Sequence, residues 1–245
     1  MNKSFLFNDT SSLVAIVPAA GVGKRMQSHR PKQYLTLLNQ TVLEHTVEKL
    51  LAHRRICHVI IALGEYDDYF SQTTLVNNTQ VTTVIGGQER VDSVLAALKS
   101  IPNFENTWAL VHDAARPCLR LNDIDKLIQH CKEYHHGALL ATPVRDTMKR
   151  AQANSTTVAY TENRKNLWHA LTPQMYPAEQ LLLAIESALA SDSIITDESS
   201  AIEILGEKSS LIEGCSDNIK ITRPDDLALA EFILHKQLQQ QEINP

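Results

Sequence analysis

Four cations near the amino terminus follow a turn rich in small residues, and their spacing suits the binding of a polyanion. The turn spans residues 18–23, and the cations are Lys24, Arg25, Arg30 and Lys32. No acidic residue lies between Asp9 and Glu44, although the whole chain has a formal charge of −5. Glycine in the turn lets the backbone approach a ligand closely. We therefore expect a phosphate-rich ligand of defined shape at this local positive segment.

The order of residues in this segment excludes two common phosphate-binding loops. A Walker-type loop places a glycine where Pro18 stands, and a serine or threonine where Arg25 follows Lys24. A dinucleotide fingerprint has a third glycine at the position of Met26. The segment resembles the signature of nucleotidyltransferases, which hold a nucleoside triphosphate while its α-phosphate is attacked. The alternative is a plain strand-to-helix loop with solvated cations.

Two further stretches come directly after predicted buried strands and can join the same site. Gly86-Gly87 can bring backbone groups against a nucleobase, and Asp113 is a carboxylate suited to Mg²⁺, which takes one or two carboxylates besides phosphate oxygens and water. In an open parallel sheet, ligands bind beyond the carboxyl ends of the strands. The alternative for Asp113 is a structural ion pair with Arg116.

Length and composition indicate one α/β domain and exclude several other classes. The chain has 245 residues, of which 43% are hydrophobic and 21% charged, as in ordinary globular proteins. The negative net charge argues against nucleic-acid binding, and no apolar run is long enough to span a membrane. We expect residues 1–12 to form a flexible tail. The four cysteines are scattered, which favours free thiols and a cytoplasmic location.

The elements that would position these residues alternate between strand and helix. Strands are predicted over 13–17, 57–63, 81–85, 108–111 and 137–144, and helices over 41–55, around 94–98 and over 121–135, with a polar helix-like segment after residue 64. This alternation predicts a Rossmann-like α/β fold, whose mostly parallel sheet carries helices on both faces.

The alternation breaks after Pro143. Residues 144–166 are polar and rich in threonine, with a strand expected over 156–160, and they predict a protruding two-stranded β-arm that cannot be stable alone. A strand over 167–171 and helices over 177–189 and 196–205 follow. A last strand is expected over 218–222, and a final helix begins near Thr222. We assign residues 13–245 to one nucleotidyltransferase domain, in which 144–166 serve as a dimerisation and substrate arm.

Seven motifs in order carry a resemblance to one known family. They are Pro-Ala-Ala-Gly-x-Gly at 18–23, Pro-Lys-Gln-Tyr at 31–34, Gly-Gly-x-x-Arg-x-x-Ser at 86–93, Val-His-Asp-Ala-Ala-Arg-Pro at 111–117, Arg-Asp-Thr at 145–147, Ala-Leu-Thr-Pro-Gln at 170–174 and Asp-Asn-Ile-Lys at 217–220. From residue 13 to about 235 the chain resembles the 2-C-methyl-D-erythritol 4-phosphate cytidylyltransferases. The first motif alone is shared with nucleotide-sugar pyrophosphorylases.

The resemblance implies a reaction and a role for each matching residue. CTP and methylerythritol phosphate would give pyrophosphate and 4-diphosphocytidyl-2-C-methyl-D-erythritol, a non-mevalonate isoprenoid precursor. Mg²⁺, or another divalent cation in its place, would be held at Asp113. The implied catalytic residues are Arg25 and Lys32. Those implied for the nucleotide are Ala19, Ala20, Gly21, Gly23, Lys24, Gly87, Gln88, Ser93, Ala114 and Arg116. Those implied for the acceptor are Thr147, Arg164, Thr172 and Lys220, with the arm of a homodimer supplying Thr147 and Arg164.

Elementary chemistry supports this reaction. The nucleophile would be a phosphate monoester, whose second pKa is about 6, so it is largely a dianion at neutral pH and needs no general base. The difficulty is to bring two anions together, which requires positioning and fixed positive charge. Two alternatives stay open: a nucleotide-sugar pyrophosphorylase with another phosphorylated acceptor, and a non-catalytic nucleotide-binding module.

Overall fold

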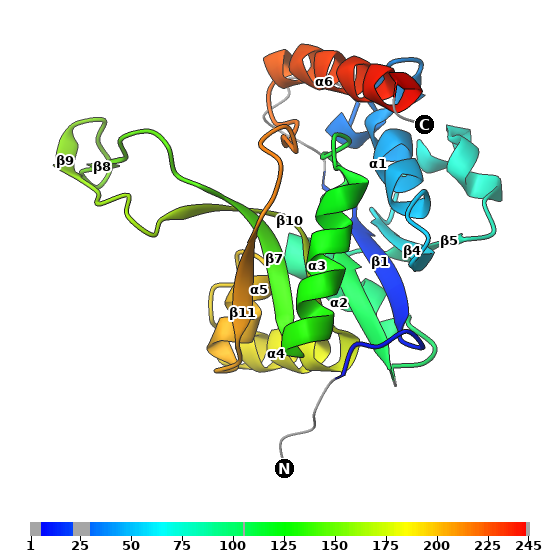
Figure 1. Ribbon diagram of the computed structural model, residues 1–245, viewed down its shortest axis with the longest axis horizontal. Helices are drawn as coiled ribbons and strands as arrows, with labels where there is room; N and C mark the ends of the chain where they lie inside the picture. The colour runs from blue at the N-terminus through cyan, green and yellow to red at the C-terminus, as the bar shows by residue number, and fades with distance from the viewer. Residues whose placement is uncertain (1–5, 22–29, 105, 244–245) are drawn as a thin grey trace.

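A seven-stranded sheet forms the centre of the computed structural model, which describes residues 6–21, 30–104 and 106–243 (Figure 1). Its strands lie in the order β11-β7-β10-β6-β1-β4-β5. β10 is antiparallel to β6 and β7, and the other pairings described for this sheet are parallel. The bounds are β1 (Ser12–Pro18), β4 (Ile56–Leu63), β5 (Val81–Ile85), β6 (Thr107–Val111), β7 (Gly137–Pro143), β10 (Trp168–Pro177) and β11 (Ser209–Glu213).

β1 lies in the interior of the sheet because both of its faces are apolar. Leu13, Ala15 and Val17 belong to one buried cluster, whereas Val14 and Ile16 belong to a second cluster on the opposite face. This alternation follows from the two-residue period of a strand. A strand that is covered on both faces reads as a continuous hydrophobic run, as the sequence predicts.

Helices cover both faces, as predicted. α1 (Val42–Leu51) and α3 (Leu121–Tyr134) contribute to the first cluster, and α2 (Arg90–Lys99), α4 (Ala178–Ala190) and α5 (Glu198–Ile204) contribute to the second. α6 (Pro224–Ile243) lies beyond the carboxyl ends of the strands (Figure 1). There it packs on a third cluster, which contains Leu37, Ala115, Cys118 and Ile221.

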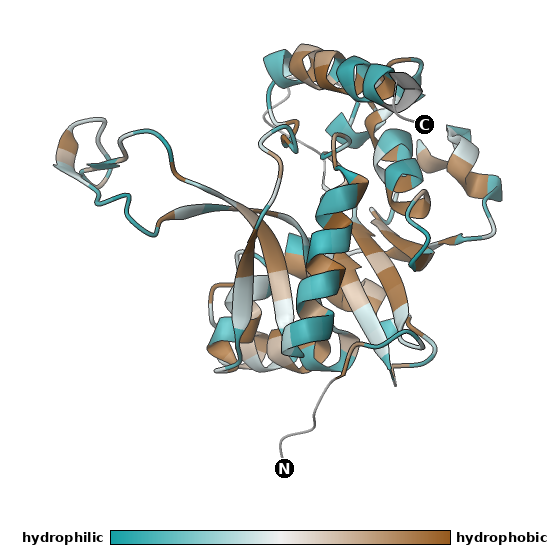
Figure 2. Cartoon of the chain, in the orientation of Figure 1, coloured by the Kyte–Doolittle hydropathy of each residue, from teal (hydrophilic) through white to brown (hydrophobic). Residues whose placement is uncertain are grey.

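A two-stranded arm projects from the ends of β7 and β10 (Figure 1). Its antiparallel strands are β8 (Lys149–Ala151) and β9 (Val158–Thr161). Figure 2 shows the arm as mainly hydrophilic, but Val158 and Tyr160 are each more than half exposed. The predicted arm is therefore confirmed. A second small hairpin, β2 (Thr36–Leu37) with β3 (Gln40–Thr41), precedes α1.

The strand predicted over 218–222 is wrong. The backbone of this segment is bound by loops instead: the carbonyl of Asn218 accepts a bond from Arg116, and the amide of Ile221 donates to Ala115. The edge strand is β11, which pairs with β7 and whose residues are exposed or only half-buried. β11 lacks a buried apolar run, so its sequence has no strand signal of that kind.

Two other expectations need correction. Residues 6–11 are not a loose tail, because Phe7 is 3% exposed and packs edge-on against Trp108, and the guanidinium of Arg55 donates to the carbonyls of Asn8, Asp9 and Ser11. Residues 1–5 lie outside the described part. The helix-like segment after residue 64 holds two short 3₁₀ turns, Phe70–Gln72 and Thr74–Asn77. No helix within the described residues is long and apolar enough to cross a membrane.

Candidate active site

A pocket of about 160 Å³ lies at the carboxyl ends of β1, β5 and β6. The loops after these three strands bring together residues from four of the predicted motifs, and Lys220 belongs to a fifth. The predicted site residues that line the pocket are Ala19, Ala20, Gly21, Lys32, Gly87, Gln88, Ser93, Asp113, Ala114 and Lys220. Gly23, Lys24 and Arg25 lie outside the described residues. The pocket thus combines a glycine-containing loop with ammonium groups and a carboxylate.

Gln33 holds the loop that follows β1. Its side-chain amide donates to the carbonyls of Ala19, at 2.6 Å, and Gly21, at 3.0 Å, and the residue is 3% exposed. Two carbonyls of the loop are therefore turned toward the protein. Lys32, beside it, donates from Nζ to the carbonyl of Ile221 at 3.2 Å. Gln33 belongs to the Pro-Lys-Gln-Tyr motif, but sequence reasoning assigned it no role.

The glycines after β5 are required because neighbouring atoms approach them closely. A Cβ on Gly87 would lie 2.2 Å from the Cβ of Asp92, and one on Gly86 would lie 2.6 Å from Oγ of Ser93. The Gly87 amide donates to that hydroxyl at 3.2 Å, and Ser93 is buried. Any larger residue at these positions would displace the start of α2. Because Gly87 has no side chain, its backbone itself forms part of the pocket wall.

Asp113 is surrounded by three cations. Its Oδ1 lies 3.0 Å from Nε of Arg90, and its Oδ2 lies 2.8 Å from Nζ of Lys220 and 3.4 Å from Nε of Arg116. Burial alone would raise the pKa of Asp113, but Arg90, Lys220 and Arg116 together lower this pKa well below its usual range. The carboxylate is therefore ionised at neutral pH.

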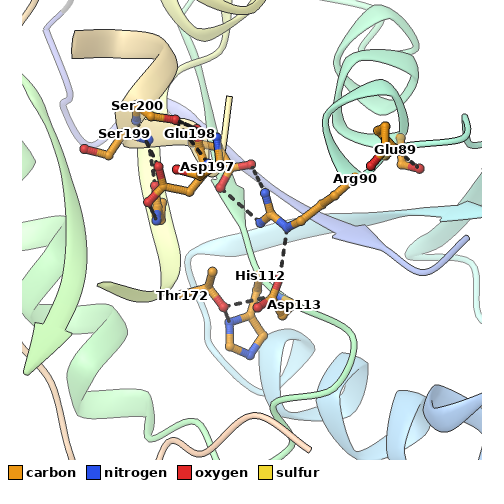
Figure 3. A network of polar contacts seen from close by, with 12 residues as sticks. Glu89, Arg90, His112, Asp113, Thr172, Asp197, Glu198, Ser199 and Ser200 are labelled. Atoms are coloured by element: carbon orange, nitrogen blue, oxygen red, sulfur yellow. Dashed lines mark hydrogen bonds and ion pairs between the residues drawn. The ribbon is translucent and has the colours of Figure 1, made fainter. Parts of the chain in front are cut away.

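Arg90 is a pocket residue to which sequence reasoning gave no role, although its motif was recognised. Its guanidinium contacts Asp113 on one side and both carboxylate oxygens of Glu198 on the other, at 2.6 and 3.1 Å (Figure 3). Glu198 is 2% exposed and lies on α5, far along the chain from the motif of Arg90. No recognised motif contains Glu198, so this pairing had no sequence signal.

Two predicted site residues lie behind the pocket wall. Arg116 is buried and donates from Nη1 to the carbonyl of Asn218 at 2.7 Å. Thr172, where the pairing of β10 shifts register, accepts a bond from the Asp113 amide at 3.1 Å and bonds to Nδ1 of His112 at 3.0 Å (Figure 3). Neither residue lines the pocket described above, and both contact Asp113 from within the protein.

The remaining two predicted residues lie on the arm. Thr147 and Arg164 are exposed, and the Arg164 guanidinium donates to the carbonyl of Arg145. Neither lines the pocket. Figure 1 shows the arm directed away from the body of its own chain. The structure of one chain therefore does not bring these two residues together with the rest.

The residues at the pocket fit a magnesium ion of the kind that takes most ligands from phosphates and water. No group of three or more His, Cys, Asp or Glu side chains that could hold a metal occurs in the described part of the chain. Asp113 offers one ionised carboxylate at the pocket wall. One carboxylate is sufficient for Mg²⁺ when substrate phosphates complete its coordination.

The pocket combines a turn of small residues with ammonium groups and an ionised carboxylate. This combination suits nucleotidyl transfer, so the site defines the protein as a nucleotidyltransferase. The family model of 2-C-methyl-D-erythritol 4-phosphate cytidylyltransferase matches residues 13–236. A Vibrio vulnificus (strain CMCP6) protein of that name is 53% identical, with 93% of this chain and 96% of the relative covered. One from Escherichia coli O7:K1 is 52% identical, with 93% and 95% covered.

Solved structures agree with these relatives. The crystal structure of Francisella tularensis 2-C-methyl-D-erythritol 4-phosphate cytidylyltransferase has a TM-score of 0.79 at 33% identity, with 91% of this chain and 100% of that chain covered. The chain therefore belongs to the 2-C-methyl-D-erythritol 4-phosphate cytidylyltransferase family.

Proposed function

We propose that the pocket at the ends of β1, β5 and β6 is where this cytidylyltransferase transfers CMP from CTP to 2-C-methyl-D-erythritol 4-phosphate. The products are pyrophosphate and 4-diphosphocytidyl-2-C-methyl-D-erythritol, in the non-mevalonate route to isoprenoids. The observation that carries the proposal is that one pocket is lined by Gly21, Gly87, Asp113, Lys32 and Lys220. These residues come from five of the motifs that carry the family resemblance.

The nucleotide would bind across the loops after β1 and β5. Gln33 directs the carbonyls of Ala19 and Gly21 toward the protein, which keeps these acceptors away from an anionic triphosphate. Gly87 and Gln88 also line the pocket, where backbone and amide groups can bond to the edge of cytosine. Predicted roles for Lys24 and Arg25 at the phosphates remain predictions.

The chain's cations would bring the two anionic substrates together. Lys32 and Lys220 both line the pocket. Lys32 donates to the carbonyl of Ile221, the residue that follows Lys220, so this bond holds the two lysines near each other. A phosphate dianion needs no proton removed before it attacks. Fixed ammonium groups that meet the charge developing at the α-phosphate would therefore supply most of the catalysis.

Asp113 would hold Mg²⁺, or another divalent cation in its place. When bound, such an ion neutralises phosphate charge and polarises the phosphoryl oxygens. Asp113 is ionised and reaches the pocket wall. Arg90, which also lines the pocket, and Arg116, which lies behind the wall, hold the carboxylate in place. When the acceptor binds, Lys220 would break its contact with Oδ2 of Asp113 and bind the acceptor phosphate instead.

The acceptor site would be completed by a second chain. Thr147 and Arg164 lie on an arm that projects away from the body of its own chain (Figure 1), and the arm exposes two large apolar side chains, Val158 and Tyr160. A two-stranded segment of this size needs a surface to lie on. A homodimer with two-fold symmetry would place each arm at the partner's pocket and build two identical sites.

A cytoplasmic location also remains a prediction.

Release of pyrophosphate from four nucleoside triphosphates tests the proposal. We expect release from CTP in the presence of methylerythritol phosphate, and little from UTP, ATP or GTP or without the acceptor. Release from UTP with a sugar phosphate would instead indicate a pyrophosphorylase. Binding of CTP without any release would indicate a nucleotide-binding module.

A further inference from the structure

Glu198 lies outside the pocket wall formed by the catalytic motifs, yet it is tied to Asp113 through a single arginine. Both oxygens of the Glu198 carboxylate accept bonds from Arg90, from Nη1 at 2.6 Å and from Nη2 at 3.1 Å. The remaining nitrogen of the guanidinium, Nε, donates to Oδ1 of Asp113 at 3.0 Å. All three guanidinium nitrogens are therefore bonded (Figure 3).

The planar guanidinium of Arg90 links the positions of the two carboxylates, because it bonds to both of them. Its donors form a rigid fork, so a two-point contact with Glu198 determines the direction in which Nε points. A lysine at this position has a single ammonium group, which cannot bond to both carboxylates in fixed directions. Because Glu198 is 2% exposed, water does not compete strongly for the pair.

Glu198 is itself held against the sheet. The buried Gln174 of β10 accepts a bond from the Ser199 amide at 2.8 Å and donates to Oδ2 of Asp197 at 2.9 Å. Gln174 pairs with Val111 of β6, the strand that leads into Asp113. The start of α5 and the pocket carboxylate are thus fixed to neighbouring strands, and Arg90 spans the space between them.

We infer that Glu198 is a positioning residue for cytidylyl transfer, which acts through Arg90 to hold Asp113 in place. The inference rests on the proposed function, in which Lys220 leaves Asp113 for the acceptor phosphate. Arg90 then remains the contact to Oδ1, and Glu198 keeps Arg90 from turning toward the triphosphate. Without Glu198, the half-buried guanidinium would have Asp113 as its one described carboxylate partner.

The first test compares two glutamates of the same helix. Glu198→Gln keeps the shape of the side chain but removes its charge, and Glu203→Gln makes the same change at an exposed residue that bonds to Ser199. We expect Glu198→Gln to lower kcat/KM about 10²-fold, since a displacement of about 1 Å can cost that much, and Glu203→Gln to leave it unchanged. Equal activity of the two variants would overturn the inference.

A double-mutant cycle separates positioning from a mere loss of stability. In an Arg90→Met background, Glu198→Gln should cause little further loss of kcat/KM, because the route to Asp113 is already broken. Additive losses in the two backgrounds would contradict the inference and assign Glu198 to the stability of α5. If Arg90→Met does not fold, Arg90→Lys serves as the background, since it cannot bridge both carboxylates.

A spectroscopic measurement gives a readout that does not depend on turnover. The NMR signal of the Arg90 Nε–H, bonded to Asp113, should shift in Glu198→Gln and stay in place in Glu203→Gln. An unmoved signal in both variants would overturn the inference. Wild-type activity with CTP and methylerythritol phosphate is measured first: an inactive wild type contradicts the proposed function, whereas an active wild type with a fully active Glu198→Gln contradicts only the role of Glu198.

Discussion

Nζ of Lys220 lies 2.8 Å from Oδ2 of Asp113, although the two residues come from motifs far apart in the chain. One is predicted to bind the acceptor and the other to bind the metal. Their ion pair means that each is partly neutralised by the other before substrates arrive. A phosphate that binds Lys220 would therefore also release one oxygen of Asp113, which couples the two halves of the site.

Lys32 should act mainly in the transition state. We expect Lys32→Ala to lower kcat by about 10²–10³-fold, which corresponds to about 3–4 kcal/mol for one lost stabilising contact, with a smaller change in the KM for CTP. Arg25→Ala should behave in the same way. Lys99→Ala is a matched control, because Lys99 pairs with Glu186 on the surface. A variant at Lys32 that keeps kcat and loses only CTP affinity would show that Lys32 has another role.

Asp113→Asn should raise the magnesium concentration required for activity, because a neutral amide is a poorer ligand for this cation than a carboxylate. The midpoint of a magnesium titration at saturating CTP measures the effect. Asp125→Asn, at a side chain that is 62% exposed, provides the control. An unchanged midpoint would leave Asp113 with the structural role that its three cations already indicate.

His112 should make stability depend on pH. Burial, the largest cause, lowers its pKa from 6.5 to about 4, and the ring bonds to Thr172 and to the carbonyl of Arg116. Between pH 6.5 and 4 the unfolded chain binds more protons at this residue than the folded chain, so stability is lost as the pH falls. We expect this contribution to be about 3 kcal/mol, from 1.36 kcal/mol per pKa unit.

Urea unfolding at pH 6.5 and at pH 4 measures that difference. His112→Gln should lose less stability than the wild type over this range, whereas His235→Gln, at an exposed residue of α6, should match the wild type. If His112→Gln shows the full loss of the wild type, other groups cause the acid sensitivity.

Much of the fold follows from local patterns. Buried strands such as β1 and β6 are continuous apolar runs, and the glycines after β1 and β5 mark close approaches at the sheet edge. β11 could not be predicted in this way because it is an edge strand without a buried face. Residues 218–222 have the alternation of a strand, but their backbone bonds to loops.

Some residues of the site were predictable from the sequence and others were not, as for the fold. The pocket lining was predictable where a motif follows a strand, as at Asp113 and Gly87. The partner of Arg90 was not, because Glu198 lies on another helix and no local spacing joins the two. Thr172 and Arg116 belong to motifs, but only tertiary contacts reveal that both face the interior.

The arm should complete the partner's site. Lys32→Ala and Arg164→Ala, each inactive alone, are unfolded and refolded together in equal amounts, so that about half of the dimers are mixed. Each mixed dimer then has one site with both defects and one intact site, which restores about one quarter of the wild-type sites. Absence of recovery, with exchange verified by mass, would mean that each chain completes its own site.

³¹P NMR of the complete reaction shows directly whether this pocket joins CMP to methylerythritol phosphate. With CTP, methylerythritol phosphate and Mg²⁺, we expect the phosphate-monoester signal to disappear while pyrophosphate and a new diphosphate ester form in equal amounts. Lys32→Ala should slow all three changes together. Hydrolysis of CTP with the monoester signal unchanged would show that the pocket does not transfer CMP to this acceptor.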